Sequence, residues 1–240
     1  MTQANVDQRP RFERLVRRVA AEGLEPYGFQ GETGRLWTRP VGPDVTHRVE
    51  WQKGKWTRST AVSFYLNLDA FWVSGPNTAW PEASQPRPAH VVGTRLRIAD
   101  DDPDFDTVTE ASGQPSETRR DLFVLKSDVS EDAAATVLLR LLAQQGRPEL
   151  DCVVDAESCV KALREPDASI PGAEALMQYF GDLGDRDQVQ EQYWRLRRHF
   201  RHRNFPRNPR LQAMVADLSL TEPPPPANSH AEGGSPSLSR

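Results

Sequence analysis

The chain has 240 residues, of which 37% are hydrophobic and 27% charged, and this is the composition of an ordinary soluble protein that can bury a core. Its formal net charge of −4 argues against a general nucleic-acid binder. The most apolar run, residues 137–143, is short and contains Arg140, so we predict no membrane span. The N-terminal residues lack the apolar core of a secretory signal, and we expect a cytoplasmic protein.

The N-terminal region predicts an amphipathic helix. Phe12, Leu15, Val16 and Val19 recur at helical spacing, while arginines occupy the other face. A short strand is expected at 35–39.

Two long runs follow, at 45–56 and 62–72. In the second run, apolar residues alternate with polar ones, which is the period of a half-buried strand. We interpret the two runs as one antiparallel unit. The proline-rich stretch 74–89 predicts a loop, and strands are expected again at 94–99 and 121–125.

The later part of the chain is predicted to be helical. Ser130 can cap a helix over 131–145 that ends at Gly146. Further helices are expected at 156–164, 171–180, 186–200 and 209–218. We therefore expect an α+β domain at 1–166, with an antiparallel sheet of about four to five strands packed by helices. A helical extension at 167–219 packs on it, and a disordered Pro/Ser-rich tail spans 220–240.

One face of the predicted sheet collects polar side chains. If the strands pair as expected, the candidate ligand or partner face contains Arg48, Glu50, Gln52, Ser63, Tyr65, Asn67, Asp69, Arg95 and Arg97. Such a set of carboxylates, amides and guanidinium groups can hold a polar ligand or a loop of a partner protein. The other interpretation is the solvated side of an antiparallel sheet. As a third, Glu50 and Asp69 could divide the roles of acid and base in a small enzyme.

Two other segments offer alternatives. Residues 195–210 contain seven arginines and no acid, so Arg195, Arg198 and His202 are candidates for nucleic-acid contact, although the outer face of a packed helix has the same pattern. Trp51, Trp56, Trp72 and Trp80 could form a stacking platform or belong to the core.

No metal site is predicted. The acidic run 100–106 has five aspartates, but Thr107 and Gly113 stand where a calcium loop needs glycine and glutamate. Cys152 and Cys159 have neither the spacing nor the neighbouring histidines of a zinc site, and we expect both to be reduced packing residues.

Four short motifs resemble a known family. They are Leu24-Glu25-Pro26-Tyr27-Gly28-Phe29, Val49-Glu50-Trp51-Gln52-Lys53-Gly54-Lys55-Trp56, Phe64-Tyr65-Leu66-Asn67-Leu68 and Arg95-Leu96-Arg97-Ile98. Together they resemble domain-of-unknown-function family 4304, over about residues 12–165. The resemblance implies a bacterial protein with an N-terminal helix, antiparallel strands and later helices, and it implies no particular activity.

From the sequence we expect a cytoplasmic, non-enzymatic binding or protein-interaction module that uses the polar sheet face. The partner is expected to be a protein, without a cofactor, a metal or a membrane. The small enzyme and the nucleic-acid contact are the alternatives.

Overall fold

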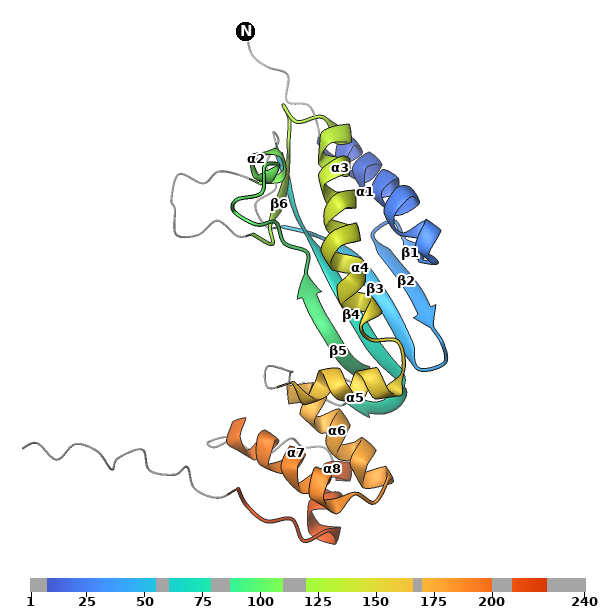
Figure 1. Cartoon of the computed structure of the whole chain (residues 1–240), viewed down its shortest axis with the longest axis vertical. Helices are drawn as coiled ribbons and strands as arrows, with labels where there is room; N and C mark the ends of the chain where they lie inside the picture. Colours follow the sequence, from blue (N-terminus) through green and yellow to red (C-terminus); the bar gives the residue numbers. More distant parts are fainter. Residues whose placement is uncertain are drawn as a thin grey trace, which may run out of the picture.

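The computed structural model describes residues 8–54, 61–78, 87–109, 120–165, 170–199 and 209–223 (Figure 1). A six-stranded antiparallel sheet lies at its centre. The strands are β1 (Gln30–Thr33), β2 (Leu36–Val41), β3 (Val45–Lys53), β4 (Ala61–Thr78), β5 (Arg87–Arg95) and β6 (Phe123–Lys126). They follow the order β1-β2-β3-β4-β5, and β6 pairs with the first residues of β4. The predicted α+β class with an antiparallel sheet is confirmed.

Helices cover one face of the sheet and gather at one end of it. The helices are α1 (Arg9–Gly23), α2 (Phe105–Val108), α3 (Glu131–Leu141), α4 (Arg147–Asp151), α5 (Ala156–Arg164), α6 (Ile170–Asp182), α7 (Arg186–His199) and α8 (Pro209–Asp217). A 3-10 turn follows α1 at Glu25–Tyr27, and a π-helical turn, Leu142–Gly146, joins α3 to α4. In Figure 1, α1, α3 and α4 lie in front of the sheet, and α5 to α8 lie below it.

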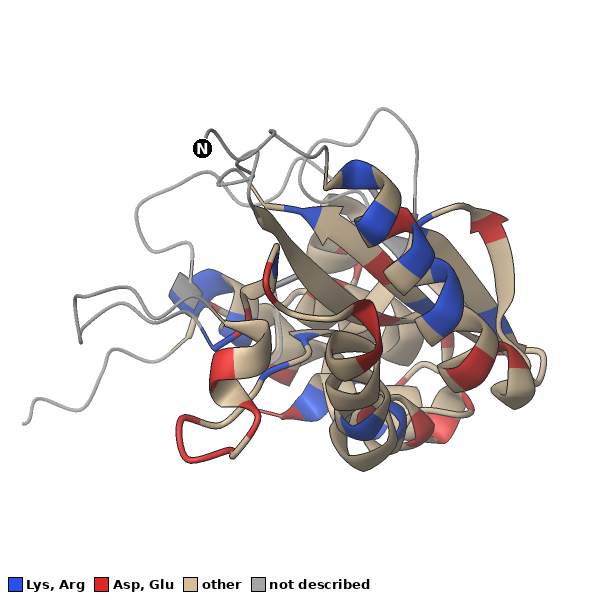
Figure 2. Ribbon diagram, turned by 90° about the horizontal axis from the view of Figure 1, so that it is seen from above, with Lys and Arg blue, Asp and Glu red and all other residues tan. Residues whose placement is uncertain are grey.

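The helix α1 forms where the apolar spacing predicts it. Phe12, Leu15, Val16 and Val19 are all buried, because their common stripe faces the sheet and α3. The opposite stripe of arginines is visible in Figure 2, and two of them, at positions 11 and 14, form ion pairs with Glu131 at the start of α3. Ion pairs on the exposed side and apolar contacts on the buried side therefore hold α1 and α3 together.

The alternation in β3 and β4 places two kinds of side chain on opposite faces. Val49 pairs with Leu68 and Trp51 with Leu66, and all four are buried under the helices. His47 shares that face, as strand parity predicts, and is fully buried. The polar residues that alternate with these along β3 and β4 point to the other face.

Three predicted boundaries are wrong, and one strand was not predicted. Residues 74–78 and 87–89 of the predicted loop end β4 and begin β5, whereas 79–86 lie outside the described residues. Pro88 is accepted in β5 because this is an edge strand. The strand predicted at 94–99 ends at Arg95, although Leu96 and Ile98 stay buried. The chain continues helically through Gly146, which is buried against Leu142. Strand β1 was not predicted, since its four residues are exposed and carry no apolar pattern.

The C-terminal helices are capped and packed as their sequence predicts. Asp155 forms a capping box with Ser158 at the start of α5. At the start of α7, the side chain of Asp185 accepts a hydrogen bond from the backbone amide of Gln188. The ring of Tyr179 on α6 contacts Trp72 on β4, with centroids 5.0 Å apart. The buried side chains of α5, α6 and α7 therefore belong to the same core as the sheet.

The beginning of the predicted tail lies against α7. The Thr221 carbonyl accepts bonds from Gln190 and Trp194, and Glu222 accepts bonds from Tyr193 and Arg197. Residues up to 223 are thus part of the folded structure, whereas 224–240, and with them most of the predicted tail, lie outside the described residues.

Candidate functional site

The polar side chains of the sheet align in rows across the strands. Arg48 of β3 pairs with Asp69 of β4, which pairs with Gly93 of β5. In the next row, Glu50 pairs with Asn67, and Asn67 pairs with Arg95. A third row contains Gln52 and Tyr65. The register therefore brings the predicted polar residues of three strands onto one face, opposite the helices.

Asp69 lies at the centre of this face. Its Oδ2 accepts bonds from two guanidinium nitrogens of Arg48, at 3.0 and 2.8 Å, and its Oδ1 accepts a bond from Nε2 of His90 at 2.8 Å. Burial raises the pKa of Asp69, but the bonds from His90 and Arg48 outweigh burial and leave the pKa below its usual value. Asp69 is therefore held as a carboxylate with both oxygens occupied.

His90 is a site residue that the sequence did not reveal. Its ring stacks on Phe71, with centroids 5.1 Å apart, and crosses the position where a Cβ at Gly93 would stand. A bulge explains the arrangement: Ala70 pairs with Val92 and Phe71 with His90, so one residue of β5 is left over. Without that bulge, His90 and Gly93, three positions apart, would face opposite sides.

Arg95 is fixed in a similar way at the edge of the sheet. Its guanidinium group lies 4.2 Å from the centre of the Tyr65 ring and donates to Asn67 at 3.3 Å and to Asp121 at 2.7 Å. Asn67 in turn donates to Gln52 at 3.1 Å. The central charges of the face are thus held in place by neighbouring side chains.

An open hollow of about 400 Å³ lies over this face. Six of the nine predicted residues line it, namely Arg48, Glu50, Asn67, Asp69, Arg95 and Arg97, together with four that were not predicted, His90, Gly93, Thr94 and Asp121. Gln52, Ser63 and Tyr65 do not line it. Ser63 is 3% exposed and packs against Gly54. Tyr65 is 8% exposed, and its ring lies beneath the guanidinium group of Arg95.

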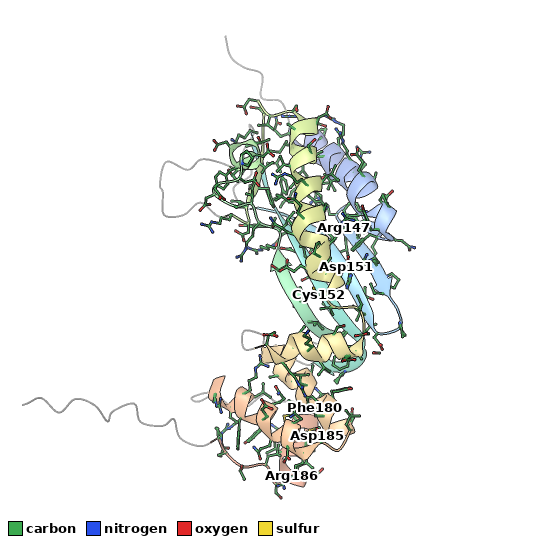
Figure 3. All side chains as sticks on the ribbon, viewed as in Figure 1. Arg147, Asp151, Cys152, Phe180, Asp185 and Arg186 are labelled. Carbon is green, nitrogen blue, oxygen red and sulfur yellow. The ribbon has the colours of Figure 1, made fainter. Side chains whose placement is uncertain are left out.

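A second hollow, of about 510 Å³, shares three residues with the first. Thr94, Arg95 and Arg97 line both, and the second is completed by Gln145, Pro148, Glu149 and Cys152. Gln145 belongs to the π-helical turn, Pro148 and Glu149 belong to α4, and Cys152, labelled in Figure 3, directly follows α4. Burial raises the pKa of Glu149, and the charge of Arg97 opposes that rise. The second hollow therefore lies between the end of β5 and α4 and adjoins the first along the shared residues.

The candidate nucleic-acid residues have different surroundings. Arg195 donates at 2.8 Å to the carbonyls of both Leu163 and Glu165, so its guanidinium group caps the end of α5. Arg198 is exposed on α7, and His202 lies outside the described residues. Three of the five aspartates at 100–106 pair with other arginines, since Arg140 pairs with both Asp102 and Asp104 and Arg120 pairs with Asp100.

The structure describes two of the four candidate tryptophans and both cysteines. Trp51 and Trp72 are each 2% exposed and belong to the core, while Trp56 and Trp80 lie outside the described residues. Both cysteines are free thiols: Cys159 is buried, as predicted for a packing residue, whereas the prediction is wrong for Cys152, which is exposed. Among the residues that the structure describes, no three metal-ligating side chains come together. No described helix is long and apolar enough to cross a bilayer.

Comparisons with protein-family models, with curated proteins and with solved structures found no match to this chain. The resemblance to family 4304 therefore rests on the four short motifs and stays a prediction.

Proposed function

We propose that this protein is a non-enzymatic, cytoplasmic protein-interaction module that binds its partner through the hollow on the polar face of the sheet. The observation that carries the proposal is the division of the charges there. Arg48, Asp69 and Arg95 are committed to fixed bonds, whereas Glu50 and Arg97 have no ion pair or hydrogen bond among the described residues.

A face of this kind suits recognition. The fixed pairs keep the rows of side chains in one geometry, which lowers the entropy cost of binding. Glu50 and Arg97 then present one negative and one positive group to a partner. Complementary charges at these two points would give specificity and orientation more than raw affinity.

The acid–base alternative is supported less well. A general acid needs a raised pKa, whereas Asp69 has a lowered pKa and two occupied oxygens. One observation nevertheless favours a reaction of another kind: Asp69 holds His90 with its Nε2 toward the carboxylate, and the His90 side chain is 41% exposed. A histidine oriented in this way can act as a general base through Nδ1.

The experiment that tests the proposal is a pull-down from a bacterial lysate with the purified protein immobilised. We expect a protein partner that is retained by the wild type and lost with Glu50→Arg and with Arg97→Glu. Lys161→Glu on α5 is the control, because this exposed lysine lies outside both hollows and its change should leave capture intact.

A second set of variants separates binding from catalysis. Wild type, Glu50→Gln, Asp69→Asn and His90→Gln are assayed against chromogenic esters and phosphoesters. If the wild type turns over a substrate, a folded His90→Gln or Glu50→Gln protein does not, and no partner is captured, the proposed interaction module is wrong and the protein is an enzyme.

A further inference from the structure

Strand β5 forms an open edge of the sheet beyond its pairing with β4. It is the last strand of the main path, and no described strand pairs with its outer side (Figure 1). The α5 and α6 helices contact β5, and Gly93 near its end is exposed. An open edge of this kind is a template for a further strand.

The register shows which backbone groups point outward. The amide of Leu96 donates to the carbonyl of Leu66, and the same register pairs Thr94 with Leu68. Because directly bonded pairs alternate along an antiparallel ladder, Gly93 and Arg95 turn their amides and carbonyls away from β4. No described residue bonds to these four groups.

The two hollows flank this stretch of edge. The hollow of about 400 Å³ lies on the polar face beside Gly93 and Arg95, and the hollow of about 510 Å³ lies on the helix face beside Thr94. Successive side chains of an added strand point to alternate faces, so they would enter the two hollows in turn.

Two guanidinium groups stand at the end of this edge. Arg95 is the last residue of β5 and pairs with Asp121, and Arg97 follows the strand, close enough to Glu149 for their charges to interact but with no hydrogen bond or ion pair among the described residues. Glu50 lies two strands away, roughly 10 Å across the sheet. An acidic side chain opposite Arg95 would also meet Arg97 and form a cross-strand ion pair. On the helix face, Gln145 and Glu149 offer acceptors to a small hydroxyl side chain.

We infer that the partner of the proposed interaction module docks as an extended segment that adds an antiparallel strand to β5, with acidic side chains at alternate positions facing Arg95 and Arg97. This inference rests on the proposed function and names its binding mode. A second copy of this chain fits the edge less well, because edge-to-edge pairing would bring the Arg95 and Arg97 of both copies to one seam.

The test uses a fluorescent seven-residue peptide, blocked at both ends, in which threonine alternates with glutamate. Fluorescence anisotropy should give a dissociation constant below about 1 mM at low salt. The same peptide with lysine in place of glutamate should not bind, and Arg97→Glu should weaken the glutamate peptide at least about tenfold. Lys161→Glu should leave its affinity unchanged.

Backbone methylation of the peptide tests the strand geometry without altering the protein. Glutamates opposite Gly93 and Arg95 turn their amides toward β5, whereas the threonine amides point away. N-methylation at the glutamates should abolish binding, and N-methylation at the threonines should preserve it. In the complex, the amides of Gly93 and Arg95 should become protected from hydrogen exchange, while that of Thr94, already paired with Leu68, changes little.

The outcomes separate this inference from the proposed function. If the glutamate peptide does not bind, or if both methylated peptides bind equally, the added strand is wrong, although partner capture that depends on Glu50 and Arg97 would still stand. If that capture fails as well, both proposals fall. A protein that sediments as a dimer in which the amides of Gly93 and Arg95 are protected from hydrogen exchange would assign the edge to a second copy instead.

Discussion

Asp69 binds two side chains from the strands on either side of it, Arg48 of β3 and His90 of β5. Replacing it with asparagine keeps the volume but sets an amide nitrogen against a donor, either Arg48 or His90. We expect Asp69→Asn to lower the free energy of unfolding by about 1–3 kcal/mol in a denaturant titration. Asp128→Asn, which changes an exposed carboxylate in a turn, is the matched control and should have little effect. Equal losses in the two variants would contradict a bonded role for Asp69.

His47 makes the stability of the fold depend on pH. It is fully buried, accepts a bond from Arg39 at 2.8 Å through Nδ1 and donates to the Val153 carbonyl at 2.6 Å through Nε2. Burial lowers the pKa of His47, and the charge of Arg39 adds to this, against the bond to Val153 and the nearby Asp151. A proton on Nδ1 would face the Arg39 guanidinium group.

The sign of the effect follows from proton linkage. The unfolded chain takes up a proton on His47 near pH 6.5, whereas the folded chain does so only at lower pH. The stabilisation is therefore complete above pH 6.5 and declines as the pH falls below it, by at most about 1.4 kcal/mol per unit. Denaturant titrations from pH 7.5 to 5.0 should show this decline in the wild type and a weaker one in His47→Gln. Parallel curves would exclude His47 as the cause.

At the level of single residues, the sequence could predict faces better than contacts. Strand parity put His47 inside and Asp69 on the polar face, because a period of two leaves no other choice in a half-buried strand. It could not place His90 beside Asp69, since the bulge that turns His90 onto that face carries no pattern of its own. The exposed Gly93 was the nearest signal, because a glycine inside a strand marks a bulge or a close approach.

Arg195 links two helices of the C-terminal region. Its two bonds satisfy carbonyls at the end of α5, which the helix leaves without partners. We expect Arg195→Ala to lower the free energy of unfolding by about 1–2 kcal/mol. Arg198→Ala, three residues further along α7 and exposed, should change it by less than about 0.5 kcal/mol. A larger loss at Arg198 than at Arg195 would contradict this division of roles.

At the level of elements, errors arose where local signals conflict with tertiary packing. Prolines at 86 and 88 indicate a loop, yet β5 begins at Arg87, because an edge strand needs only half of its amides. Gly146 indicates a helix end, yet its missing side chain lets the chain pass close to Leu68 and Leu96. In both places the neighbouring structure, which the sequence does not display, decided the outcome.

At the level of the whole molecule, the C-terminal helices and the sheet share one buried core. Leu176 on α6 is fully buried in that core, close to the Tyr179 ring that contacts Trp72 of β4. The loss of packing at α6 should therefore reach the sheet, and the two parts should unfold as one cooperative unit.

Leu176→Ala tests this coupling. Removal of a fully buried leucine side chain should cost about 2–5 kcal/mol. Thermal unfolding is followed by far-UV circular dichroism for the helices and by tryptophan fluorescence for the sheet. Three of the four described tryptophans, Trp37, Trp51 and Trp72, lie on its strands, and the fourth, Trp194, lies on α7. We expect both signals to shift to the same lower temperature. If the fluorescence transition stays at the wild-type temperature while the helical signal moves, the extension unfolds on its own and the shared core does not couple the two parts.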